Sequence, residues 1–273
     1  MGQVVHTLPE GEEVCGVALL ADEVYVLRRK ERDQVEVYDV INYRLQRCLT
    51  VPNICAFIDM TSCEHYHCVY IADCIVYLIH KVDVQGAATQ WAVNGRPRGI
   101  SVNAAHNLLV TCPHVRKIKE FSSHGDLLRE LTLPDDVINP RHAIQTRNGE
   151  FIVCHGHYGD AVHRVCKISA DGRHIIKSHG GQPGSDIGQY YVPAHLAVDN
   201  NEFVFVVDLN NRRVTLLSPT LDYIRQVVSS DGLTLGWYPI RLCVDIRRRL
   251  LYVAETEFKE RVSTAGRVVV FSV

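Results

Sequence analysis

The chain has 273 residues, of which 47% are hydrophobic and 22% charged, and this composition is typical of a globular protein with a sizeable core. Its 29 basic and 31 acidic residues nearly cancel, which excludes a globally basic nucleic-acid or membrane binder but not a local basic patch. No apolar run reaches the roughly 18–20 residues of a membrane span, and the first residues lack the basic and apolar regions of a signal peptide. We therefore expect a cytoplasmic protein that does not enter a membrane.

Short runs of β-branched and aromatic residues, each about five residues long and bounded by Gly, Asn, Asp or Pro, recur along the whole chain. No segment carries the period of about 3.6 residues that marks an amphipathic helix. In chain order the runs are 24–28, 35–39, 68–73, 75–79, 108–112, 151–155, 203–208, 250–255 and 267–271. The sequence therefore predicts an all-β protein.

A template also repeats along the chain: Pro, two variable residues, an apolar residue, a small residue, an apolar residue and Asp. Its copies start at 14, 53, 97, 140, 193 and 239, so successive starts are separated by 39, 44, 43, 53 and 46 residues. Segments 193–199 (PAHLAVD) and 239–245 (PIRLCVD) match closely, whereas 14–20 (VCGVALL) and 53–59 (NICAFID) lack the aligned proline. A period in this range is typical of repeat architectures, and here it predicts six units.

Each unit continues with a second strand about ten residues on, a third, and a fainter fourth. Four antiparallel strands per unit, arranged radially, predict a six-bladed β-propeller that forms a single domain over 1–273. The last unit ends on its third strand at 267–271, so we expect segment 4–8 to supply the fourth and close the ring. Small residues at or next to the fifth template position should face the crowded axis, and these are Ala18, Ala56, Ser101, Ala197 and Cys243.

Ten cysteines are present, and several stand at irregular spacings inside apolar segments. Buried free thiols are the simplest interpretation in a reducing compartment. Examples are Cys15, Cys55, Cys112, Cys154, Cys166 and Cys243. Cys63 and Cys68 enclose two histidines and look like a metal clip, but no second pair has a fitting spacing, so a hairpin turn is the better interpretation.

The most patterned stretch, 180–217, reads GGQPGSDIGQYYVPAHLAVDNNEFVFVVDLNNRRVTLL. Its Gly-x-x-Gly loop, the Pro before the strand and the Asp-x-x-Asn-x-Arg turn resemble an NHL repeat. The resemblance is strong in this unit, partial in the next and faint in the other four. It implies a six-bladed propeller similar to the C-terminal NHL domain of tripartite-motif proteins, in agreement with the count of units.

The resemblance also implies functions. Several NHL propellers bind single-stranded RNA on a basic face and others bind proteins, whereas one enzyme with this propeller, an amidating lyase, holds zinc with histidines at the channel. Asp208, Asn211 and Arg213 are the residues most like the family, and we interpret them as structural: the first two should close a turn, and Arg213 should bridge neighbouring blades.

If the loops before the inner strands and the turns after the second strands share one rim, as the resemblance implies, basic residues gather there. Guanidinium groups bind phosphates and carboxylates through paired hydrogen bonds, so these residues are candidate ligand-binding residues. The alternative is that each one pairs with an acidic neighbour or a loop carbonyl. The candidates are Arg96, Arg98, Arg116, Arg141, His142, His195, Arg212 and Arg241.

A zinc site is the competing interpretation of the rim. His142 and His195 hold the same template position in adjacent units, and His155 and His157 lie in the turn beside them, so three imidazoles could meet. In the lyase, however, histidine directly follows the proline, where this chain has Arg141, and an offset of one residue turns a strand side chain to the other face. We therefore expect no metal or other cofactor.

The sequence thus favours a non-enzymatic recognition module that presents a cationic, histidine-containing rim to an extended anionic ligand. Single-stranded RNA is the first choice for that ligand and an acidic protein segment the second. A zinc-dependent lyase or hydrolase at the channel is the alternative. We expect the isolated domain to be monomeric, and the sequence leaves the identity of the ligand open.

Overall fold

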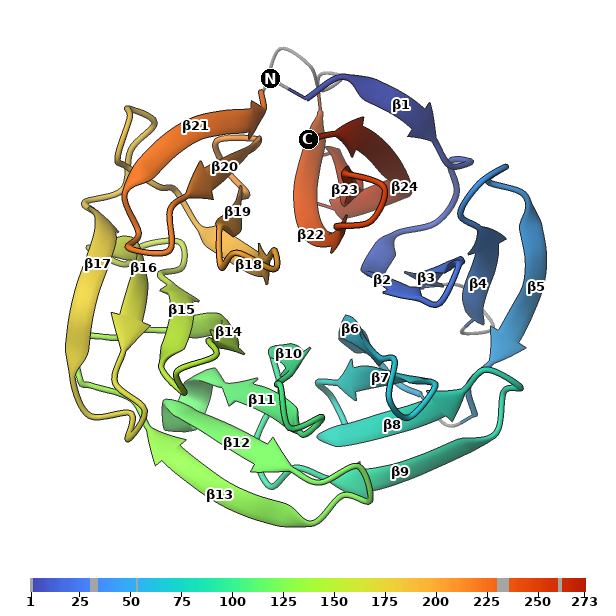
Figure 1. The fold of residues 1–273 in the computed structure, drawn as a ribbon, viewed down its shortest axis with the longest axis horizontal. Coiled ribbons are helices and arrows are strands. Elements are labelled where there is room, and N and C mark those ends of the chain that lie inside the picture. The colour runs from blue at the N-terminus through green and yellow to red at the C-terminus, as the bar shows by residue number, and fades with distance from the viewer. Residues whose placement is uncertain (1, 30–33, 53, 230–235, 260–261) are drawn as a thin grey trace.

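A computed structural model describes residues 2–29, 34–52, 54–229, 236–259 and 262–273. Six four-stranded antiparallel sheets surround a central axis, and their innermost strands converge on it (Figure 1). Both the all-β class and the six-bladed propeller predicted from the sequence are confirmed. No helix in the described ranges is long and apolar enough to cross a membrane.

The strands of each blade follow one another from the axis outward. Blade 1 contains β2 (Val14–Leu20), β3 (Glu23–Arg28), β4 (Gln34–Asp39) and β5 (Leu45–Thr50), and blade 2 contains β6 (Phe57–Cys63), β7 (Cys68–Asp73), β8 (Leu78–Asp83) and β9 (Ala88–Ala92). Blade 3 contains β10 (Gly99–Val102), β11 (Leu108–Cys112), β12 (Lys117–Phe121) and β13 (Leu127–Thr132), with a short 3-10 helix, η1 (Pro113–Val115). Blade 4 contains β14 (Pro140–Gln145), β15 (Phe151–His155), β16 (His163–Ile168) and β17 (Ile175–Gly181). Blade 5 contains β18 (Pro193–Val198), β19 (Val204–Asp208), β20 (Arg213–Leu217) and β21 (Tyr223–Val228), and blade 6 contains β22 (Trp237–Asp245), β23 (Leu250–Lys259) and β24 (Val262–Ser272).

The N-terminal strand β1 (Val4–Thr7) completes blade 6. It pairs antiparallel with β24, so the strand order of this blade is β1-β24-β23-β22. Figure 1 shows β1 on the outside of the ring beside β24, with both chain ends at this blade. The predicted closure by segment 4–8 is confirmed, and it joins the first and last parts of the chain in one sheet.

The core lies between neighbouring blades rather than at the axis. Leu27 and Val37 of blade 1, for example, pack in one buried cluster with Met60 and Ile71 of blade 2. Burying such side chains contributes roughly 1.5–3 kcal/mol each, so contacts between sheets hold the disc together.

One sequence expectation is wrong in register. The inner strand of blade 2 is Phe57–Cys63, four residues later than the start predicted at 53, and residue 53 itself lies outside the described ranges. The template had been aligned on the Asp that ends 53–59, but Phe57 pairs with Asp73 at the start of the strand. Counted from Phe57, the residue at the fifth position of this strand is Thr61, and Ala56 lies before the strand. Asp59, which the sequence alignment placed at the seventh and last position of the template, is in fact at the third position.

All ten cysteines are free. Seven are buried, as expected, whereas Cys48 and Cys55 are exposed and Cys243 is partly exposed. Burial of Cys55 was therefore wrongly predicted, because this residue precedes β6 instead of lying in it. Cys63 and Cys68 face each other at the β6–β7 hairpin, which agrees with the turn interpretation.

Candidate functional site

The six inner strands all begin on the same face of the disc, which we call the top face. Because each second strand runs antiparallel to its inner strand, the turn after it returns to this face. The predicted rim therefore exists: loops before β10, β14 and β18 lie there with the turns that follow β7, β11, β15 and β19.

One position of each inner strand projects into the channel. In blades 1, 2, 4, 5 and 6 it directly follows a β-bulge, and the bulge turns the side chain towards the axis. Blade 3 has its equivalent residue at the start of β10. We call this set the axial ring: Gly16, Asp59, Gly99, His142, His195 and Arg241.

The four polar members of the axial ring meet in the channel. Nε of Arg241 donates to Oδ1 of Asp59 over 2.8 Å, and the backbone N–H of Ile100 donates to Oδ2 over 2.9 Å. Nε2 of His195 lies 3.5 Å and Nε2 of His142 lies 3.9 Å from the same carboxylate. The two imidazole rings are 4.0 Å apart between centroids. These side chains come from four blades and plug the channel.

Charge within the plug is balanced. Burial alone would raise the pKa of Asp59, but the nearby charges, with that of Arg241 first, hold it well below its usual range. Burial, reinforced by the neighbouring His195, lowers the pKa of His142 to about 3. Burial likewise lowers the pKa of His195. At neutral pH the plug therefore contains one carboxylate, one guanidinium and two neutral imidazoles.

One ligand atom each of Asp59, His142 and His195 lies within 4.8 Å of the others, which is the spacing of a metal site. Nε2 of His142 is 3.0 Å from the carbonyl of Ile100, which can only accept, so this nitrogen carries the proton and the lone pair of the ring is on Nδ1. Nδ1 of His142 and of His195 has no hydrogen-bond partner among the described residues. Arg241 already pairs with Asp59, so the plug is an internal ion pair.

The zinc site considered from the sequence is not assembled. His155 lies away from the channel, where its Nδ1 faces the Ile138 carbonyl and its Nε2 accepts from Arg164. His157 lines a different hollow from His142 and His195.

Below the plug, a cavity of about 220 Å³ continues along the axis towards the other face. The fifth position of every inner strand lines it, and most of these residues are small, as predicted. They are Ala18, Thr61, Ser101, Ile144, Ala197 and Cys243.

Above the plug, the top face contains a hollow of about 250 Å³ between blades 2, 3 and 4. Arg98, just before β10, and Arg141, in β14, hold the second position of the sequence template, directly before Gly99 and His142 of the axial ring. Arg141 is 6% exposed. We call this pocket the arginine hollow, and its lining is Cys74, Arg96, Pro97, Arg98, Pro113, His114, Asn139, Arg141 and His157.

The guanidinium groups of the arginine hollow form no ion pair with any residue that the structure describes. Within the described ranges, no carboxylate lies at ion-pairing distance from Arg96, Arg98 or Arg141, and Nε of Arg141 is buried without a hydrogen bond. Burial, together with the charges of Arg241 and Arg96, lowers the pKa of Arg98 to about 10. Burial and the charges of Arg98 and Arg241 also hold the pKa of Arg141 well below its usual range. The hollow is a positive cluster with two desolvated guanidinium groups, Arg98 and Arg141, and no ion pair within the described chain.

An acidic residue beside the hollow, Asp160, has other partners. Asp160 accepts from the backbone N–H of His157 over 2.7 Å and from the side-chain amide of Asn139 over 2.8 Å. It therefore orders the loop beside the hollow and does not neutralise its arginines.

Exposed apolar side chains stand around the arginine hollow. Ile75 is 64% exposed, Val115 45%, Ile138 39% and Tyr158 54%, and each directly follows or precedes a lining residue in the chain. Tyr158 is also in edge contact with Tyr191, with 6.0 Å between ring centroids. Exposed apolar residues thus adjoin the cationic lining of the hollow in the sequence.

The remaining predicted ligand-binding residues are placed differently. Arg116 pairs with Asp135 over 2.7 Å, and Arg241, His142 and His195 belong to the plug. Arg212 is half-buried in the turn after β19. The structure brings Arg96, Arg98 and Arg141 together, and it separates them from the other five.

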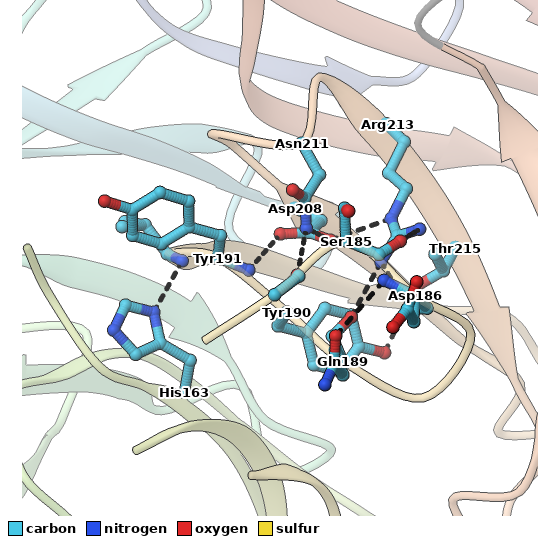
Figure 2. A network of polar contacts seen from close by, with 12 residues as sticks. His163, Ser185, Asp186, Gln189, Tyr190, Tyr191, Asp208, Asn211, Arg213 and Thr215 are labelled. Atoms are coloured by element: carbon cyan, nitrogen blue, oxygen red, sulfur yellow. Dashed lines mark hydrogen bonds and ion pairs between the residues drawn. The ribbon is translucent and has the colours of Figure 1, made fainter. Parts of the chain in front are cut away.

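In the stretch most like an NHL repeat, the residues that resemble the family form a network of polar contacts around Asp208 (Figure 2). Asp208 receives hydrogen bonds from the backbone of Tyr191 and from the side chains of Asn211 and Arg213. Arg213 also donates to the carbonyls of Ser185 and Gln189, and Figure 2 shows it bound to the loop that joins blade 4 to blade 5. These contacts fix the path of the chain between blades, as the structural interpretation expected.

Sequence reasoning missed two parts of the site. Asp59 was not recognised as an axial residue, because the template was aligned four residues too early in this blade. The pairing of Phe57 with Asp73 at the start of β6 gives its correct position. Cys74, His114 and Asn139 were not singled out, because only the fold brings their three blades together.

The fold and the plugged channel define a six-bladed β-propeller with a basic hollow on its top face. The structure resembles Staphylococcus aureus virginiamycin B lyase, with a TM-score of 0.65 and 11% identity over 97% of this chain and 98% of that one. It is also similar to the Swd1 β-propeller domain of Myceliophteria thermophila, with a TM-score of 0.66 and 11% identity over 100% of both chains. A structure of a nidogen/laminin complex matches with a TM-score of 0.63 and 13% identity over 80% of this chain and 81% of that one.

At such low identity these likenesses show the fold alone. No model of a protein family and no curated protein matches the sequence. Membership of the NHL family therefore stays a prediction, which rests on the pattern of 180–217.

Proposed function

We propose that this protein is a non-enzymatic recognition module whose top face binds an acidic segment of another protein. The arginine hollow is the observation that carries the proposal. Arg98 and Arg141 are desolvated, Arg96 is exposed beside them, and none of the three has a carboxylate partner in the described chain, so an incoming anion would supply the missing counter-charge.

The distribution of charge favours a protein segment over the single-stranded RNA expected first. An RNA strand needs cations along its whole path, but other top-face cations are already paired, including Arg116 with Asp135, Arg164 with Asp136 and Arg213 with Asp208. Three arginines without a carboxylate partner in the described chain line one hollow, and exposed apolar residues adjoin its lining in the sequence. That combination suits an acidic group flanked by apolar side chains.

The alternative of a zinc-dependent lyase or hydrolase depends on the histidines of the channel. Their carboxylate neighbour is engaged by Arg241, so no observation favours that alternative. We also propose, as expected from the sequence, that the protein is cytoplasmic and monomeric.

Fluorescence anisotropy with three labelled probes tests the proposal: an acidic peptide with interspersed Ile and Leu, the same peptide with Gln in place of Glu and Asp, and a single-stranded RNA of equal length. We expect the acidic peptide to bind most tightly. Arg98→Glu should abolish this binding, because it places a carboxylate in the hollow.

Arg173→Glu is the matched control, since it makes the same charge change in the exposed β16–β17 turn on the opposite face. It should leave binding unchanged. If RNA binds more tightly than the acidic peptide and Arg98→Glu abolishes that binding, the partner is RNA and the proposal is wrong.

A further inference from the structure

We propose that the anionic group seated in the arginine hollow is a phosphate monoester on the partner, so that recognition by this propeller depends on phosphorylation. The inference rests on the proposed function, because it specifies the chemistry of the acidic group that the top face binds. It is carried by the number, depth and arrangement of the guanidinium groups.

The charge of the hollow exceeds what one carboxylate can balance. Arg96, Arg98 and Arg141 bring three positive charges to one pocket, and no lining residue is acidic. A carboxylate has one negative charge and two oxygens, which a single guanidinium satisfies. A phosphate monoester has about −1.5 to −2 charges at neutral pH and three acceptor oxygens, so it can pair with several guanidinium groups at once.

The donors also approach from separate directions. Arg98 and Arg141 hold the same position of neighbouring inner strands, whereas Arg96 precedes Pro97 at the exposed margin. His114 reaches the hollow from η1, and His157 from the turn after β15. The three acceptor oxygens of a phosphate point in three directions, whereas the lone pairs of a carboxylate lie in one plane, so donors on several sides suit the phosphate better.

The depth of the hollow favours an anion at the end of a side chain. Arg141 is buried and Arg98 half-buried, so the group they bind must enter below the surface. A phosphorylated Ser or Thr projects its phosphate away from the peptide backbone. An internal phosphodiester of RNA is held between two riboses and has one negative charge, so it fits this pocket less well.

Four peptide libraries, identical except for a central phosphoserine, phosphothreonine, Ser or Glu and otherwise randomised, test the inference by fluorescence anisotropy. Calorimetric titration with inorganic phosphate, with acetate as its comparison, measures the anion alone. We expect the phosphorylated libraries to bind at least ten-fold more tightly than the Glu library. Inorganic phosphate should bind more tightly than acetate.

Arg98→Ala and Arg141→Lys should each weaken binding of the phosphorylated libraries at least ten-fold, and Arg173→Ala should not. Lysine keeps the charge but not the paired hydrogen bonds, so Arg141→Lys separates geometry from simple attraction. Circular dichroism shows whether the variants are folded. If Arg141→Lys does not fold, Arg96→Ala, at the exposed margin of the hollow, replaces it in the binding test.

The outcomes separate the two proposals. Equal binding of the Glu and phosphorylated libraries would retain the acidic segment and overturn the phosphate. Absence of binding by every acidic library would overturn both. Binding of RNA in preference to all libraries, abolished by Arg98→Ala, would show that the hollow serves a nucleic acid.

Discussion

Arg241 of blade 6 donates to Asp59 of blade 2 across the channel over 2.8 Å, although 182 residues separate them in the chain. The pair connects blades 2 and 6, which blade 1 separates, and Asp59 is fully buried. It therefore acts as an internal tie between blades that are not neighbours in the ring.

Removing the carboxylate of this pair should strongly destabilise the protein. Asp59→Ala leaves Arg241 buried without a counter-ion, which costs about 3–5 kcal/mol of the free energy of unfolding. Urea denaturation measures the loss. Asp135→Ala, which removes the exposed partner of Arg116, is the control and should cost less than about 1 kcal/mol. Similar losses in both variants would show that the axial pair is not a tie.

Acid should destabilise the protein through its buried histidines. The pKa of His142 is lowered to about 3, whereas the unfolded chain binds this proton near about 6.5. Because the unfolded state then binds more protons, the free energy of unfolding falls as pH decreases from 6.5 towards 3, by up to about 1.4 kcal/mol per unit from this residue. His195 acts in the same direction. Denaturation of wild type and His142→Gln across this range should show a shallower pH dependence in the variant; identical slopes would contradict the assignment.

Gly99 should not tolerate a side chain. An added Cβ would lie 2.4 Å from the Arg141 carbonyl and 2.9 Å from Cα of His142, so Gly99→Ala forces two inner strands apart. Overpacking of this kind costs typically about 1–3 kcal/mol. Gly181→Ala has open space around its Cβ and is the control. Thermal denaturation measures Tm. An equal decrease of Tm in both variants would disprove the close approach of Gly99 to the inner strand of blade 4.

The positive charges of the arginine hollow should lower the free energy of unfolding of the protein. Arg98→Met removes one of several repelling, desolvated charges and keeps most of the side-chain volume, so we expect the free energy of unfolding to rise by about 1 kcal/mol. Added inorganic phosphate should raise Tm of the wild type more than that of the variant. Destabilisation by Arg98→Met would indicate a structural role for the guanidinium.

The N-terminal strand should be an integral part of blade 6. Leu8 N–H bonds to the Val268 carbonyl over 2.8 Å, and Ser272 N–H bonds to the Gln3 carbonyl over 2.9 Å. Hydrogen exchange should therefore show protected amides in this segment. Deletion of residues 2–8 should shift the urea midpoint down, since it exposes the edge of β24; rapid exchange throughout 3–8 in the folded protein would disprove the closure.

The sequence by itself determined the class of fold, the number of blades and the closing strand. Each blade consists of strands consecutive in the chain, so its turns, its proline and its spacing leave a periodic pattern that can be read locally. The pattern of 180–217 is the clearest instance, because Asp208, Asn211 and Arg213 bind the loop just before their own blade. Counting strands from that pattern was enough to assign 4–8 to the last blade.

Only the tertiary structure decided what the basic residues do. Arg116 and Arg241 have carboxylate partners, whereas Arg98 and Arg141 have none in the described chain. The sequence does not distinguish these four arginines. Whether a guanidinium is neutralised depends on which side chains of other blades lie next to it in the fold. The four-residue shift in blade 2 shows the same limit: strand pairing, and not the local template, carried Asp59 to the axis, where Arg241 meets it.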